Sequence, residues 1–290
     1  DALSKFGIVP GTLPLVDYDI SDGDLNFMQQ GLTSADFINT VSPSYAKEII
    51  EGKYPIEISD IIKSREGRFS GILNGLDYAQ FPRNYDNSNW KSLRPTSKKT
   101  LKEKLGFKNN NDKPVFAFIG RLDPNQKGID ILHEVVPHIV EKGGQFVLLG
   151  SGNPEWEKKY AELGNMPLVK ENVSINTKLD LELANLLYSG SDFLVVPSKY
   201  EPCGLIQMIA MWYGSLPIVN NTGGLRDSVV DGETGFKFNE YSSSSLRKAI
   251  DTAFTTYQTP KMDEMIGKAL QADFSWDKSA VEYKKLYGRV

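Results

Sequence analysis

The strongest constraint on the fold is a regular alternation of short apolar runs with longer helical stretches between residues 114 and 230. Because the runs are apolar throughout and the connections are short, they predict a parallel sheet covered by helices on both faces. The fold class is therefore α/β, with a doubly wound, Rossmann-like sheet. We expect strands at 115–119, 146–149, 173–175, 193–196 and 216–219, and helices at 128–140, 155–163, 181–189, 205–213 and 225–230.

The part of the chain before this sheet has too few strand candidates to fold as a domain of its own. Its strand candidates are 36–41 and 69–77, whereas a self-sufficient doubly wound domain needs about 100 residues or more. We therefore predict that residues 1–81 are the C-terminal remnant of an N-terminal domain. Residues 82–274 form the sheet domain, and 275–290 form a final helix. The alternative is that 1–81 wraps the following domain as an extension.

Several flanking segments have local signals of their own. Residues 1–22 are loop-like, and the polar stretch 82–100 has the composition of a linker. Ser42 followed by Pro43 predicts a helix start, and Ser275 predicts the start of the last helix. Further helices are expected at 25–32, at 101–107 with Thr100 as its cap, at 242–254 and at 261–270.

Composition excludes several functions. The formal net charge of −4 argues against binding nucleic acid through phosphate attraction. No apolar run approaches the roughly 20 residues that cross a bilayer. With one cysteine and two histidines, we expect no internal disulfide and no transition-metal site. A cytoplasmic location is expected, with a plastid as the alternative for a plant or alga.

Two cations follow the first strand of the predicted sheet, in the sequence FIGRLDPNQKGID. Arg121 and Lys127 lie between Gly120 and Gly128, in the loop between a strand and a helix. Ligands of open α/β sheets bind at the carboxyl ends of the strands. Arg and Lys side chains there can bind one polyanion and stabilise negative charge on a departing diphosphate. Two solvated surface charges are the alternative.

Two neighbouring junctions carry complementary chemistry. Thr222, Gly223 and Gly224 precede a helix whose unpaired N–H groups favour an anion. Glu201 follows the strand at 193–196 and is suited to accept hydrogen bonds from sugar hydroxyls. A phosphate beside hydroxyl groups indicates a nucleotide sugar. A buried structural Glu201 is the alternative, and Cys203 is better explained as a packed thiol than as a nucleophile.

Two further signals are weak. Gly150-Ser151-Gly152 follows a strand, but a tight turn explains it as well as a ligand does. Asn74 precedes Gly75 at a strand end, where it could face an interdomain cleft and bind a sugar hydroxyl. A turn-forming Asn-Gly pair is at least as good an explanation.

Together these motifs resemble the glycogen and starch synthase family of glucosyltransferases, which have the two-domain GT-B architecture. The resemblance runs over nearly the whole chain and rests on ADFINTVSPSYAKEI, GILNGLD, GRLDPNQKGID, LLGSGNPEWE, EPCGL, TGGLRD and DFSWDKSAVEYKKLY. It implies transfer of glucose from ADP-glucose or UDP-glucose to the non-reducing 4-hydroxyl of an α-1,4-glucan, with retention. No metal and no further cofactor are implied.

The resemblance also implies roles for individual residues. Arg121 and Lys127 would contact the donor diphosphate, and Glu201 the donor glucose; these are the implied catalytic residues. The implied substrate-binding residues are Asn74, Gly120, Cys203, Gly204, Leu205, Ile206, Thr222, Gly223 and Gly224.

Some family features are not found in this chain. A Lys-x-Gly-Gly loop and a sugar-site histidine would precede Asp1, which implies a truncated chain. Ile209 stands where the wider GT-B group often has a second Glu, and no aromatic residue is evident before Leu181 to stack on the base. Two other functions are possible on the same residues: a GT-B transferase with a small-molecule acceptor, or a non-catalytic module that binds a nucleotide sugar or a glucan.

Overall fold

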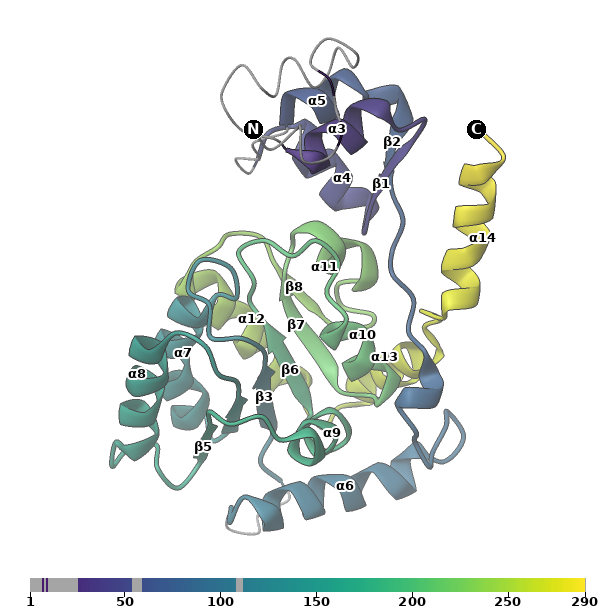
Figure 1. Cartoon of the computed structure of the whole chain (residues 1–290). Helices are drawn as coiled ribbons and strands as arrows, with labels where there is room; N and C mark the ends of the chain where they lie inside the picture. The colour runs from purple at the N-terminus through teal and green to yellow at the C-terminus, as the bar shows by residue number, and fades with distance from the viewer. Residues whose placement is uncertain (1–6, 8, 10–25, 54–58, 108–111, 290) are drawn as a thin grey trace.

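The computed structural model describes residues 7, 9, 26–53, 59–107 and 112–289. They form a small N-terminal unit and a larger body built on a sheet (Figure 1). The N-terminal unit contains α3 (Phe27–Ser34), β1 (Ile38–Thr40), α4 (Pro43–Ile50), α5 (Ser59–Ser64), a 3-10 turn η1 (Glu66–Arg68) and β2 (Phe69–Gly71). A second 3-10 turn, η2 (Tyr78–Gln80), follows in the connection to the body.

The body is built on one sheet of parallel strands in the order β5-β4-β3-β6-β7-β8. The strands are β3 (Val115–Ile119), β4 (Gln145–Leu149), β5 (Val173–Asn176), β6 (Phe193–Val196), β7 (Leu216–Asn220) and β8 (Phe236–Phe238). The chain winds outward from β3 to β5 and then returns to place β6 on the other side of β3. The boundary between β3 and β6 is therefore a topological switch point.

Helices cover both faces of this sheet. One face carries α7 (Ile129–Glu141), α8 (Pro154–Asn165) and α12 (Ser243–Thr256). The other carries α9 (Leu181–Gly190), α10 (Ile206–Trp212) and α13 (Pro260–Gln271), with α6 (Trp90–Lys104) packed on α9. The short α11 (Gly223–Ser228) follows β7.

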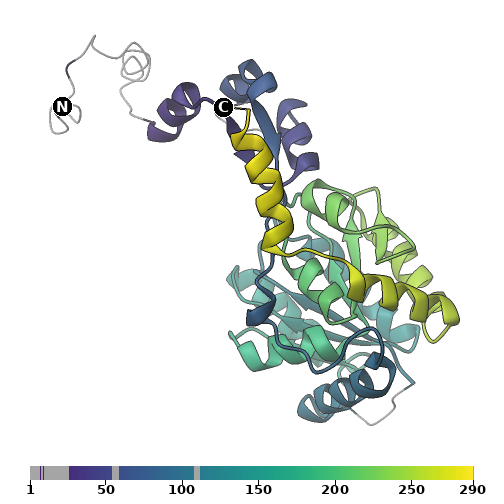
Figure 2. The ribbon, with the colours of Figure 1, turned by 90° about the vertical axis from the view of Figure 1, so that its right-hand side faces the viewer.

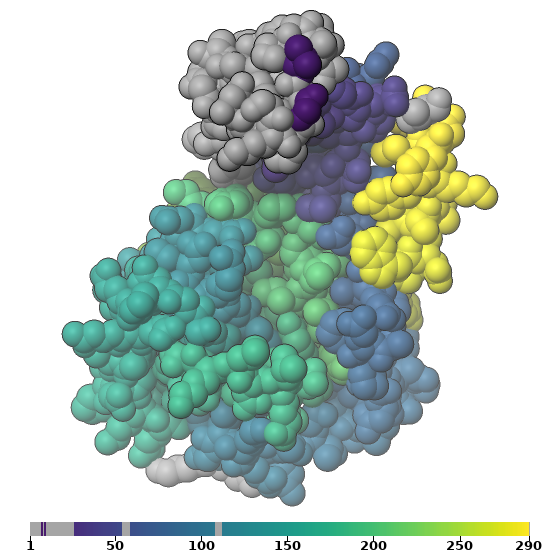
Figure 3. All heavy atoms as spheres, viewed as in Figure 1, coloured from purple at the N-terminus to yellow at the C-terminus, as the bar shows by residue number. Residues whose placement is uncertain are grey.

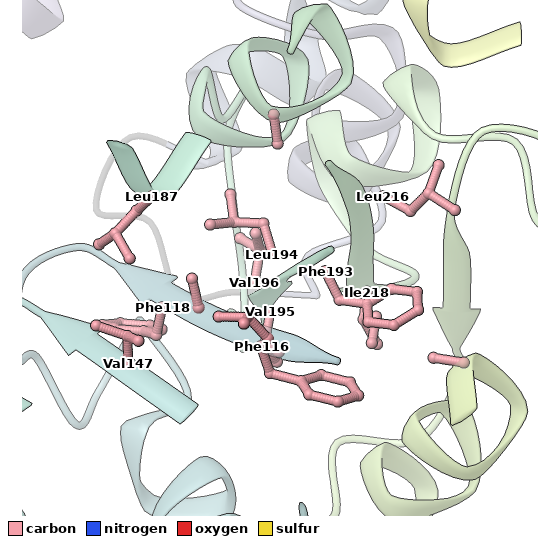
Figure 4. Packing of buried hydrophobic residues seen from close by; sticks show 14 of the residues in the cluster. Phe116, Phe118, Val147, Leu187, Phe193, Leu194, Val195, Val196, Leu216 and Ile218 are labelled. Atoms are coloured by element: carbon pink, nitrogen blue, oxygen red, sulfur yellow. The ribbon is translucent and has the colours of Figure 1, made fainter. Parts of the chain in front are cut away.

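The core lies between these layers. Every residue of β4, β6 and β7 is buried, which is why these strands are apolar rather than alternating, apart from Gln145 and Asn220 at their ends. Phe116 and Phe193 stack across β3 and β6 with ring centroids 4.9 Å apart (Figure 4). The expected strands and the doubly wound parallel sheet are confirmed; β8 and α5 were missed.

The N-terminal unit has a separate apolar cluster around Ile38, Ile49 and Phe69. β1 and β2 pair in parallel, with Ile38 opposite Phe69. The strand expected over 69–77 ends early, at Gly71, and the chain then runs extended towards the body. Only the two residues 7 and 9 of the loop expected over 1–22 are described, so that prediction falls outside the described part.

The last helix, α14 (Trp276–Tyr287), returns to the N-terminal unit. Figures 2 and 3 show it running from the end of the body along the side of that unit. Tyr283 accepts a hydrogen bond from Asn39 at 3.2 Å. The outgoing and returning chains cross where Leu76 N–H donates to Phe274 O at 2.6 Å. Ser275 caps α14 as expected, accepting from Lys278 N–H.

The linker expected over 82–100 is wrong, because α6 begins at Trp90. Thr100 caps nothing; its hydroxyl donates to Thr96 O in the middle of the helix. The buried face of α6 carries Arg94 and Lys98, which pair with Asp192 of the body. These cations separate the apolar residues Trp90 and Leu101 on the same face, so no continuous apolar stripe reveals the helix.

Candidate active site

Three loops meet at the carboxyl edge of the sheet beside the switch point. They follow β3, β6 and β7, which are neighbours in the sheet. Lys199 N–H donates to Gln126 O at 2.8 Å, and Asn220 Nδ2 donates to Ser198 O at 2.9 Å. Gly128, with φ +66°, lies so close to Pro197 that a Cβ would be 2.0 Å from its carbonyl oxygen. The loops predicted to carry the chemistry therefore lie at one edge of the sheet.

Lys127 and Glu201 form an ion pair between the first two loops. Lys127 Nζ lies 2.6 Å from Glu201 Oε2, and Ser198 Oγ donates to the same oxygen at 3.0 Å. Glu201 is only 6% exposed. The sequence suggested both residues for the site, but not that they contact each other. An ammonium has three N–H donors, of which Glu201 takes one, so the pair is compatible with a further anionic partner for Lys127.

Arg121, in the same loop as Lys127, lines a cavity of about 620 Å³. Its side chain is 69% exposed, and it donates to Gln126 Oε1 at 2.9 Å. Gly120 and Gly150 contribute backbone to the wall, while Leu179 and Leu181 contribute apolar side chains. A cavity lined by a cation, by glycine backbone and by aliphatic groups suits a flat base attached to phosphates.

The glycines at 150–152 are explained by packing. A Cβ on Gly150 would lie 2.1 Å from Gly120 O. Gly152 has φ +157° and would place a Cβ 2.9 Å from Leu122 O. The loop after β4 can therefore lie against the loop after β3, and Gly150 and Ser151 also line the cavity.

The amino end of α11 already has an anionic partner from the chain itself. Glu48 Oε1, from α4 in the N-terminal unit, accepts from Gly223 N–H and from Thr222 Oγ1, each at 3.1 Å. Gly224 N–H donates to Glu201 O at 2.9 Å. The turn predicted to attract an anion thus holds a carboxylate and supports the Glu201 loop. Its predicted contact with a phosphate stays a prediction.

Cys203 lies between the body and the chain coming from the N-terminal unit. It is 5% exposed, and burial raises the pKa of its thiol, although a backbone hydrogen bond from Asn74 opposes this. A buried, protonated thiol is a packed group rather than a nucleophile. The same contact places Asn74 next to the Glu201 loop.

The remaining predicted residues open the next helix. Gly204 has φ +71°, a left-handed conformation that suits glycine. Leu205 is the N-cap residue of α10 and is 40% exposed, and Ile206 begins the helix. Because Leu205 has an apolar side chain, it makes no capping hydrogen bond to the N-terminal N–H groups of α10.

The sequence did not point to Glu48, Lys178, Asn185 or Tyr188. The last three line the cavity, Lys178 from the segment before α9 and the other two from α9 itself. Glu48 lies within ADFINTVSPSYAKEI, a stretch that contributed to the family resemblance but suggested no role for this residue. Glu48 acquires its role from partners about 175 positions away in the sequence. Within the described residues, no group of three or more His, Cys, Asp or Glu side chains could hold a metal ion, and no helix is long and apolar enough to span a membrane.

Two protein families together and several curated proteins match most of this chain. The family model for glycosyl transferases group 1 matches residues 98–272, and that for the starch synthase catalytic domain matches residues 7–64. The glycogen synthase of Fervidobacterium nodosum is 39% identical over 99% of this chain and 61% of its own length. That of Thermodesulfovibrio yellowstonii is 40% identical over 91% of this chain and 54% of its own. The chain thus spans less than two thirds of the relatives it matches.

Solved structures give the same result for the fold. The catalytic domain of starch synthase IV from Arabidopsis thaliana, bound to ADP and acarbose, matches with a TM-score of 0.84 and 31% identity. The match covers 90% of this chain and 57% of that one. A sucrose-phosphate synthase from Thermosynechococcus elongatus, 24% identical with a TM-score of 0.64, shares the fold. The expected GT-B fold and the resemblance to glycogen and starch synthases are confirmed, and the chain belongs to the glycosyl transferases group 1 family.

Proposed function

We propose that the protein containing this chain transfers glucose from ADP-glucose or UDP-glucose to the non-reducing end of an α-1,4-glucan, with retention. One observation carries the proposal. The Lys127–Glu201 pair joins the loops after β3 and β6 at the switch point of the sheet, and Lys127 shares its loop with Arg121, which lines the 620 Å³ cavity. The identity with glycogen synthases and the likeness to a starch synthase domain that binds ADP and acarbose support this choice of donor and acceptor.

In this proposal each charge has a separate task. The cavity holds the nucleoside, with the aliphatic side chains of Leu179 and Leu181 against the base. Arg121 and the remaining donors of Lys127 hold the diphosphate and stabilise the charge that grows on it as it leaves. Glu201 accepts hydrogen bonds from the glucose hydroxyls while Lys127 and Ser198 hold its carboxylate in place. The neighbouring turn at 222–224 contributes through its support of Glu201.

Calorimetric titration with ADP-glucose and UDP-glucose tests the donor site. We expect binding by the wild-type chain and at least about tenfold weaker binding by Arg121→Ala and Lys127→Ala, because charge-assisted contacts to phosphate are among the stronger hydrogen bonds. Lys158→Ala is the matched control, since Lys158 lies on α8 with its side chain 78% exposed. Equal affinity in all four proteins would disprove the assigned diphosphate site.

Transfer assays on the protein with any sequence that precedes this chain separate the three functions left open. Incorporation into glycogen, with little into glucose or maltose, supports the glucan synthase. Transfer to a small sugar alone supports a different acceptor. Binding of the donor without turnover supports a non-catalytic module. Loss of an assigned oxyanion contact in a true transferase lowers kcat by about 10²-fold or more, so Lys127→Ala must show that loss.

A further inference from the structure

The N-terminal unit and the body cap each other's helices. Glu48 of α4 accepts from Gly223 N–H at the amino end of α11. In return Asp227 of α11 accepts from Ser44 N–H at 2.8 Å and from Ser44 Oγ at 2.5 Å, at the amino end of α4. Figure 1 shows α4 directly above α11, and the two helices pack on each other. Each carboxylate therefore meets the positive end of a helix from the other unit.

The two carboxylates have different surroundings. Glu48 is 2% exposed, and it also contacts Lys53 Nζ at 3.0 Å, which donates in turn to Thr222 Oγ1 at 3.2 Å. Thr222 makes no side-chain cap on its own helix, so its hydroxyl is committed to Glu48. The first turn of α11 is thus held in place from the N-terminal unit.

That turn lies directly against the Glu201 loop. A Cβ on Gly223 would be 2.0 Å from Glu201 O, and one on Gly224 would be 2.1 Å from Cys203 O. Gly224 N–H donates to Glu201 O at 2.9 Å. A displacement of the turn must therefore move the backbone of Glu201. Asp227 lies one turn further along α11, and its carboxylate accepts from Ser44 of α4 rather than from the turn at 222–224.

We propose that Glu48 is a positioning residue for Glu201: closure of the N-terminal unit onto α11 fixes the turn at 222–224 and thereby the loop that carries Glu201. The consequence for catalysis rests on the function proposed above, whereas the mechanical link does not. A merely adhesive role would make Glu48 and Asp227 equivalent, since each joins the same two helices.

Hydrogen exchange with mass spectrometry tests the link without any ligand. The readout is the exchange rate of peptides covering 198–206 in Glu48→Gln, Asp227→Asn and Glu51→Gln, where Glu51 is an exposed residue at the end of the same helix α4. We expect Glu48→Gln to speed exchange in this segment by about tenfold or more, because hydrogen bonds to a buried charge are lost. Asp227→Asn and Glu51→Gln should change it by less than about threefold. Equal effects of Glu48→Gln and Asp227→Asn would overturn the proposal.

A second pair of variants decides the matter if Glu48→Gln does not fold. Thr222→Val removes the hydroxyl that donates a hydrogen bond to Glu48, and Thr222→Ser keeps that hydroxyl. Faster exchange at 198–206 in Thr222→Val but not in Thr222→Ser supports the link, and identical rates in both refute it.

The catalytic consequence is measured in the transfer assay, where Glu48→Gln should lower kcat with little change in affinity for ADP, since ADP lacks the glucose that Glu201 is proposed to bind. If the wild-type protein binds no nucleotide sugar, the proposed function fails, and the exchange result still decides the role of Glu48.

Discussion

Replacing Lys127 by Met tests whether the Lys127–Glu201 pair is as important to the fold as its burial implies. The substitution keeps the aliphatic length and removes the charge. Glu201, 6% exposed, would then retain the hydrogen bond from Ser198 but no cation at 2.6 Å. Removing one partner of a fully buried pair costs about 3–5 kcal/mol. Because the Lys127 side chain is 18% exposed, we expect a smaller loss of about 2–3 kcal/mol.

Urea unfolding is the suitable assay, since guanidinium would screen the charges. Lys127→Met combined with Glu201→Gln should recover most of the loss, because no buried charge is then left without a partner. Lys99→Met is the control: its ion pair with Glu103 is exposed on both sides, at 3.9 Å, and should change stability by less than about 0.5 kcal/mol. A cost for Lys127→Met as small as that of the control would refute the reasoning. In the proposed transferase, the double variant should recover stability but not transfer activity, because both residues belong to the assigned donor site. This outcome separates the contribution of the pair to folding from its contribution to function.

Two further predictions concern the crossing of the chains and the buried cations of α6. Gly75→Ala would place a Cβ 2.4 Å from the backbone of Trp276, so we expect faster proteolysis within α14, whereas Gly31→Ala, with nothing within 4 Å, should not change it. Lys102→Met should stabilise the protein at pH 7, because burial lowers the pKa of Lys102 from 10.5 to about 8. Between pH 8 and 10.5 the unfolded chain still binds the proton that the folded chain has released, so the stability of the wild type rises with pH. In urea unfolding, the stability advantage of Lys102→Met should therefore be at most about 3 kcal/mol at pH 7 and should shrink as the pH rises to 10.5.

The apolar strands and the chemistry at their ends were predictable from the sequence. A strand buried on both faces is apolar along almost its whole length, and β3, β6 and β7 show this pattern, with only Asn220 at the end of β7 polar. Parallel strands place their carboxyl ends at one edge, so Arg121 and Glu201 could be assigned to one edge without coordinates. These signals are local, because each is contained in a few consecutive residues.

Other features depended on partners far away in the sequence. The part of α6 before residue 101 was missed because its inner face carries cations, and Asp192 makes that face compatible with the interior. The contact of Lys127 with Glu201 joins residues 74 positions apart. Glu48 reaches Gly223 across 175 positions. A charged residue has no periodicity that reveals its partner in the fold. The sequence by itself therefore determined the sheet and the kinds of groups at its edge, but not the pairing of those groups. Only the tertiary structure decided which charges meet, because burial makes each ion pair depend on where its partner is folded.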